Sequence, residues 1–137
     1  MSGFYYSHRV TYAECTLGNH IYYGRYLELL EAARGEFFRH LGSSLLTWQD
    51  QDTVFPVIEC RLRYKSPAHY DDLLRIEVWP TQAEGARLSF AYHILNQTGA
   101  LVLEAETSHA CTHVAGKPRR LPPELVAALQ AHLTSRH

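Results

Sequence analysis

Hydrophobic and polar residues alternate along four segments in the second half of the chain, the pattern of half-buried β-strands. These segments are residues 56–65, 74–78, 88–94 and 101–114. In the first segment the face expected to be buried carries Ile58, Cys60, Leu62 and Tyr64. Short turn-prone stretches connect consecutive segments, and Pro80 is expected to close the second one. The pattern predicts an antiparallel sheet. Residues 4–12 have β-type composition and are predicted as a further strand at its start.

One long helical repeat occupies the first third of the chain. Apolar residues recur every three or four positions from Tyr23 to Leu41, which is the spacing of a helix with one buried face. Gly42 follows and is suited to the left-handed position that ends many helices. After Pro122 and Pro123 a shorter apolar stripe predicts a C-terminal helix. Together the patterns predict an α+β protein in which a sheet of about five strands wraps around the long helix.

Composition narrows the class of protein. With 137 residues and 46% hydrophobic residues, the chain is predicted to form a single domain, residues 1–137, with a sizeable core. A net charge of −1 argues against non-specific nucleic-acid binding. No apolar run reaches the roughly 20 residues of a membrane span, and no secretory signal is visible. The three cysteines are odd in number and lack metal-ligand spacing, so we expect reduced thiols in a cytoplasmic protein.

A polar loop directly precedes the long helix. It runs from Tyr12 to about Tyr22 and contains Gly18-Asn19, a turn-prone pair. A helix that starts near Tyr23 leaves its first backbone N–H groups unpaired, and the helix dipole adds partial positive charge there. Such a site could stabilise an oxyanion formed from a carbonyl group.

The same stretch resembles a known family signature. Residues that match it in order and spacing are Tyr12, Tyr22, Tyr23, Tyr26, Leu27, Glu31 and Arg34. On these residues the chain is similar to hotdog-fold acyl-CoA thioesterases of the 4-hydroxybenzoyl-CoA thioesterase and YbgC type. The resemblance implies a hotdog fold and hydrolysis of an acyl-CoA, with CoA as part of the substrate and no further cofactor. It also implies a homodimer or homotetramer whose sheets join edge to edge, with the active site at the dimer interface.

The resemblance assigns roles within the loop, and the chain departs from the family there. The family's catalytic aspartate falls on Thr16, its earlier acid on Glu14 and its glycine on Asn19. A threonine cannot act as a general base near neutral pH, but its hydroxyl could hold a water molecule. The resemblance gives the Tyr23 N–H the role of oxyanion donor.

Other loop residues could assist the water. Asn19 could orient it, and Glu14, if it points to the same side as Thr16 on an extended segment, could polarise it. His20 is a candidate acid toward the leaving thiolate. Alternatively, Thr16 and Asn19 only form the loop and Glu14 is a surface residue.

Two further clusters invite interpretation. Arg34 lies beside the apolar face of the helix, so a buried ion pair with Glu31 is predicted; a role for Glu31 as a catalytic base is the alternative. Along the last strand His109, Cys111 and His113 alternate and are expected to share one face. Ligands at that spacing spread over about 13 Å on a flat strand, so we expect packing rather than a metal site.

Substrate contacts are expected from two regions. Tyr22 and Tyr26 could line a pocket for the acyl group, and Lys117, Arg119 and Arg120 could contact the phosphates of CoA. A solvated basic face is the alternative for the last three. Two other classes of function stay open: a binding module for acyl-CoA or acyl-carrier protein that lacks hydrolysis, and a hotdog enzyme of another thioester step that uses His20 with Glu31.

Overall fold

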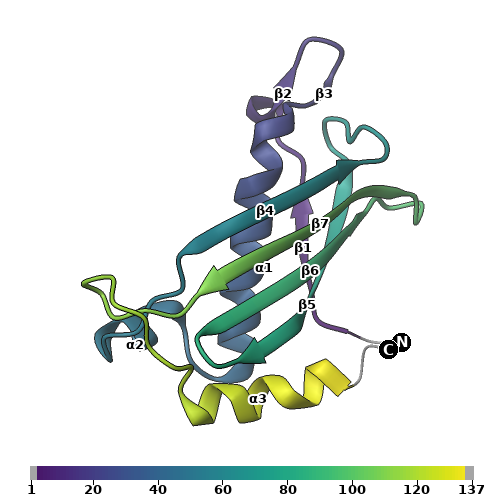
Figure 1. The fold of residues 1–137 in the computed structure, drawn as a ribbon. Coiled ribbons are helices and arrows are strands. Elements are labelled where there is room, and N and C mark those ends of the chain that lie inside the picture. Colours follow the sequence, from purple (N-terminus) through teal and green to yellow (C-terminus); the bar gives the residue numbers. More distant parts are fainter. Residues whose placement is uncertain (1–2, 135–137) are drawn as a thin grey trace.

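The computed structural model describes residues 3–134, and it confirms the predicted α+β architecture (Figure 1). Five antiparallel strands form one sheet in the order β1-β5-β6-β7-β4. Their bounds are β1 Tyr5–Arg9, β5 Leu73–Glu84, β6 Arg87–Leu95, β7 Leu101–Ala110 and β4 Val57–Tyr64. The long helix α1 (Tyr26–Leu41) packs against one face of this sheet, and α3 (Pro123–Thr134) contacts β5.

A single core joins the helix to the sheet. The helix contributes Leu29, Leu30, Ala33, Phe37 and Phe38, and the sheet contributes Leu74, Ile76, Leu88, Phe90 and Tyr92. Every one of these side chains is buried. Helical spacing on α1 and alternation on β5 and β6 therefore direct their apolar faces toward each other, as the sequence patterns predicted.

Some helices and strands begin or end at other residues than predicted, because 3-10 turns form next to them. β1 ends at Arg9, and the expected end of that strand is instead a 3-10 turn, Tyr12–Glu14. A second 3-10 turn, Tyr23–Arg25, precedes α1. At its other end the helix stops at Gly42, whose φ is 110°, as predicted. The polar connection after it contains a helix that periodicity missed, α2 (Leu45–Asp50), whose start is capped by the Ser44 hydroxyl.

Two expectations about the strands are wrong. Pro80 does not close its strand, because a bulge between Pro80 and Gln82 absorbs the missing N–H and β5 continues to Glu84. The last strand ends at Ala110 rather than at residue 114. Beyond it the alternation breaks: Cys111 is buried, whereas the His113 side chain is 40% exposed and bonds Asp52. No cluster of metal-ligating side chains occurs within residues 3–134.

The face of β4 that was expected to be buried is largely open. Ile58 and Tyr64 are each 51% exposed, and Cys60 is exposed too. β4 is an edge strand that pairs with β7 alone among residues 3–134, so one of its backbone edges is also unpaired within this part of the chain. Alternation identifies the two faces of a strand but not what covers them.

Candidate active site

The loop before α1 forms a small hairpin. Strands β2 (Cys15–Thr16) and β3 (His20–Ile21) pair so that Thr16 lies opposite His20. Gly18 and Asn19 make the turn with φ angles of 92° and 63°, as their sequence predicted. The Asn19 N–H donates to the Thr16 carbonyl over 3.1 Å. A left-handed backbone at the position of the family's glycine favours a turn-forming role for Asn19, since asparagine adopts it more readily than most residues.

Glu14 anchors the base of this hairpin. Its carboxylate accepts a hydrogen bond from the Thr11 N–H over 2.8 Å and lies 2.9 Å from Nε2 of His8. Partial burial acts to raise the pKa of Glu14, but the hydrogen bonds from Thr11 and His8 outweigh it, and the pKa lies below its ordinary value. The backbone carbonyl of Glu14 also accepts the Tyr22 N–H over 3.0 Å. The condition under which Glu14 would point to the same side as Thr16 is not met, because a 3-10 turn replaces the extended segment.

The start of the helix supplies a free backbone donor. Tyr23 is the first residue of its 3-10 turn, so its N–H has no acceptor within the helix. No other group among residues 3–134 accepts from it. The carbonyl of Tyr23 accepts a hydrogen bond from the Tyr64 hydroxyl over 3.2 Å, which ties the helix start to the end of β4.

A pocket of about 400 Å³, here called the hairpin pocket, joins the hairpin to the helix start. It gathers five of the predicted site residues: Thr16, His20, Tyr22, Tyr23 and Tyr26. Tyr26 is almost fully buried, and this burial raises its pKa. The sequence did not reveal that the end of β4 completes the wall with Tyr64, Lys65, Ser66 and Pro67. Asn19 does not line the hairpin pocket. Neither Glu14 nor any other carboxylate of the described residues lines it.

The predicted phosphate-binding residues lie elsewhere. Lys117, Arg119 and Arg120 belong to the segment between β7 and α3, which lies beside α2 at the opposite end of α1 from the hairpin (Figure 1). Arg119 donates from Nη1 to the carbonyls of Gln51 and Asp52 over 3.1 and 3.2 Å. Within one chain these three residues do not approach the hairpin pocket.

The predicted ion pair between Glu31 and Arg34 is absent from the structure. Nη1 of Arg34 instead donates to the Tyr92 hydroxyl over 3.1 Å, and Glu31 stays exposed. The guanidinium turns toward the sheet, where a hydroxyl meets it, while the carboxylate remains in water. This arrangement avoids the cost of burying two charges together.

Comparison with known proteins identifies the class. The family model of the thioesterase superfamily matches residues 18–103. The chain is 33% identical to the acyl-CoA thioester hydrolase YbgC of Escherichia coli over 87% of this chain and 90% of that one. Its identity to the acyl-CoA thioesterase YbgC of Haemophilus influenzae is 31%, over 93% and 94% of the two chains.

Solved structures agree with these sequence matches. A DHNA-CoA thioesterase from Staphylococcus aureus aligns with a TM-score of 0.86 at 26% identity and covers 93% of this chain and 88% of its own. A hypothetical protein from Aquifex aeolicus aligns with a TM-score of 0.87 at 25% identity, over 92% and 98% of the two chains. The chain therefore belongs to the thioesterase superfamily and has the hotdog fold. None of the helices within residues 3–134 has the length and apolar character needed to span a membrane.

Proposed function

We propose that the protein hydrolyses the thioester of an acyl-CoA to a free acid and CoA. One observation carries the proposal: the hairpin pocket combines an unpaired helix-start N–H with hydroxyl and imidazole side chains. The relatives named acyl-CoA thioester hydrolases, which match almost the whole chain, support the substrate class. CoA enters as part of the substrate, and no further cofactor is needed for this chemistry.

The proposed mechanism uses three groups of the pocket. The thioester oxygen accepts a hydrogen bond from the Tyr23 N–H, which strengthens as negative charge develops on that oxygen. The Thr16 hydroxyl holds the water molecule that attacks the carbonyl carbon. His20, opposite Thr16 across the hairpin, takes a proton from this water and returns it to the CoA thiolate as the carbon–sulfur bond breaks. Asn19 and Glu14 then act on the hairpin backbone rather than on the water.

The proposal includes a homodimer formed through β4. An exposed edge strand with an open apolar face requires a partner or a cover. Two-fold antiparallel pairing of β4 with a second copy would set the Val57 end of one strand beside the Tyr64 end of the other. The segment that carries Lys117, Arg119 and Arg120 in the second copy would then approach the hairpin pocket of the first. This geometry reconciles their distance within one chain with a role in binding CoA phosphates. A tetramer of such dimers and a cytoplasmic location remain predictions.

Thiol release from a panel of acyl-CoAs tests the function. The panel should contain acetyl-, hexanoyl-, octadecanoyl- and benzoyl-CoA, with the free thiol detected as it forms. We expect turnover of at least one member, and a lower rate in a His20→Asn variant. Binding of these acyl-CoAs by calorimetry without thiol release from any of them would overturn hydrolysis and indicate a binding module.

A further inference from the structure

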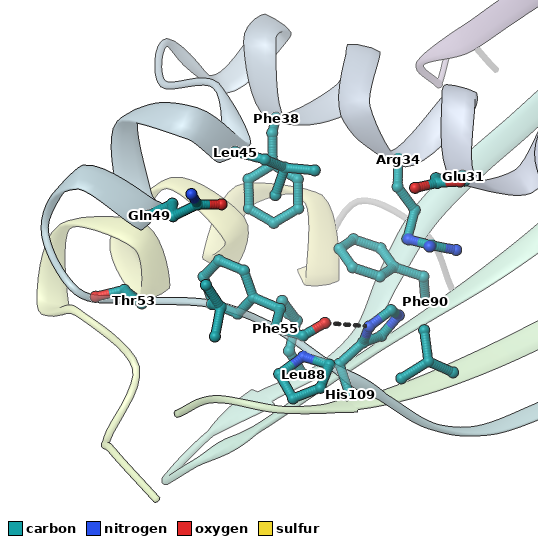
Figure 2. A pocket seen from close by; sticks show the side chains of 13 residues that line it. Glu31, Arg34, Phe38, Leu45, Gln49, Thr53, Phe55, Leu88, Phe90 and His109 are labelled. Atoms are coloured by element: carbon teal, nitrogen blue, oxygen red, sulfur yellow. Dashed lines mark hydrogen bonds between the residues drawn. The ribbon is translucent and has the colours of Figure 1, made fainter. Parts of the chain in front are cut away.

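A second cavity lies between α1, α2 and the sheet. It has a volume of about 310 Å³, and we call it the distal chamber. Three aromatic rings line it, those of Phe38, Phe55 and Phe90 (Figure 2). The Phe38 ring stacks on Phe55 with centroids 5.5 Å apart and meets Phe90 edge-on at 6.1 Å. Leu45 and Leu88 add aliphatic surface. This is the kind of lining that favours apolar ligands.

The polar groups at the inner wall already have partners in the chain. His109 lies 3.1 Å from the Phe55 carbonyl through Nδ1 and 2.9 Å from the Thr107 hydroxyl through Nε2. Because a carbonyl can only accept, Nδ1 carries the proton and Nε2 accepts from Thr107. Burial lowers the pKa of His109 to about 4, so the imidazole is neutral at pH 7.

The directions of the neighbouring hydrogen bonds follow from the position of the His109 proton. The Thr107 hydroxyl donates its one hydrogen to Nε2 of His109. The Tyr92 hydroxyl, whose oxygen is 2.7 Å from that of Thr107, must therefore donate to Thr107. Arg34 in turn donates to Tyr92. His109, Thr107 and Tyr92 are therefore hydrogen-bonded and uncharged, and among the described residues that line the chamber Arg34 and Glu31 are the charged ones. A ligand that enters the chamber needs no polar groups to match this wall.

The distal chamber adjoins a second hollow, and together they form a groove along α1. A neighbouring hollow of about 330 Å³ is lined by Leu27, Leu30 and Cys60, among others, and shares Glu31, Arg34 and Val57 with the chamber. Positions 27, 31, 34 and 38 follow the three- and four-residue spacing of one helix face. From Leu27 to Phe38 this face extends about 16 Å at the rise of an α-helix. Leu27 is one helical turn beyond Tyr23.

We propose that the distal chamber binds the far end of a long, unbranched apolar acyl chain, whose thioester lies at the hairpin pocket. This inference rests on the proposed function and names its substrate class. A long acyl chain follows the groove along α1, passes Arg34 and ends among the three phenylalanine rings. A guanidinium is weakly hydrated, so its face can pack against the passing methylene groups. A short acyl group leaves the chamber unused.

The test places a tryptophan side chain at the rim of the distal chamber. Leu45 is on α2, lines the chamber and is 39% exposed, so Leu45→Trp introduces a large ring without disturbing the core. Leu46→Trp is the matched control, because Leu46 is the next residue, is 63% exposed and does not line the chamber. Gln49→Trp, at a second exposed lining position, repeats the test if the first variant melts at a lower temperature.

We expect Leu45→Trp to lower kcat/KM for octadecanoyl-CoA at least about 100-fold, since even one excluded methylene costs about tenfold or more. The value for hexanoyl-CoA should stay unchanged, and Leu46→Trp should alter neither. Equal effects of Leu45→Trp on both substrates, or on neither, would overturn the inference while leaving hydrolysis intact.

A binding measurement tests the role of the distal chamber independently of thioester hydrolysis. S-Octadecyl-CoA, a thioether that cannot be hydrolysed, should bind the native protein more tightly than S-hexyl-CoA. Leu45→Trp should abolish that difference. If no acyl-CoA is hydrolysed but this pattern of binding holds, the proposed function fails and the chamber stands. If the two thioethers bind the native protein equally, the chamber is not an acyl site.

Discussion

Replacing Tyr23 by proline removes the proposed oxyanion donor without breaking a backbone hydrogen bond. Tyr23 is the first residue of its 3-10 turn, so its N–H makes no hydrogen bond within the helix. Proline is tolerated at such a position. The preceding residue, Tyr22, has φ −64° and ψ 133°, an extended conformation that is compatible with a following proline. The substitution therefore costs the fold no backbone hydrogen bond.

The side chain of Tyr23 is lost as well, and a second variant corrects for it. The ring lies 4.7 Å from that of Tyr22 and 6.4 Å from that of Tyr64. Tyr23→Ala loses the same contacts but keeps the N–H. Relative to Tyr23→Ala, we expect Tyr23→Pro to lower kcat by about 10²–10³-fold, or roughly 3–4 kcal/mol of barrier, as for the loss of one oxyanion donor.

Steady-state thiol release with the acyl-CoA that turns over fastest measures the difference. KM should change little between the two variants, because the donor acts mainly on the transition state. Melting temperatures should agree within a few degrees, which would show that proline fits the turn. Two folded variants with equal kcat would refute the reasoning and exclude the Tyr23 N–H as the oxyanion donor.

Three further substitutions test neighbouring parts of the site. Thr16→Asp, which restores the family's acid, should raise thiol release about 10²–10⁴-fold in a His20→Asn background, where the proposed base is missing; an unchanged rate in that background would show that position 16 does not face the water. Glu14→Gln should lower the free energy of unfolding by roughly 1–3 kcal/mol near pH 7. Because the pKa of Glu14 lies below its ordinary value of 4.5, this loss of unfolding free energy should fade in urea titrations as the pH falls below 4.5. If a folded Glu14→Gln variant instead loses all turnover, Glu14 is the catalytic base. Arg34→Ala should cost about 1 kcal/mol in urea unfolding, since one hydrogen bond to Tyr92 is lost rather than a buried ion pair; a loss above about 3 kcal/mol would contradict this arrangement.

Elements that depend on neighbouring residues could be predicted from the amino-acid sequence. Apolar spacing located α1, alternation located the strands, and Gly18-Asn19 and Gly42 marked backbone turns that the structure places in left-handed conformations. These signals are local because hydrogen bonds and side-chain faces repeat within a few residues. The match of loop and helix residues to a family signature also indicated the thioesterase class before any geometry was known.

Tertiary structure alone decided which distant groups meet. Arg34 is three residues from Glu31, yet its partner is Tyr92, 58 positions away, because the guanidinium points into the sheet. The wall of the hairpin pocket includes the end of β4, which no local pattern could place beside residue 16. Likewise, alternation gave β4 an apolar face, and the sheet order made it an uncovered edge. Short-range periodicity specifies which face of an element is apolar, whereas the contacts of that face depend on how the whole chain packs.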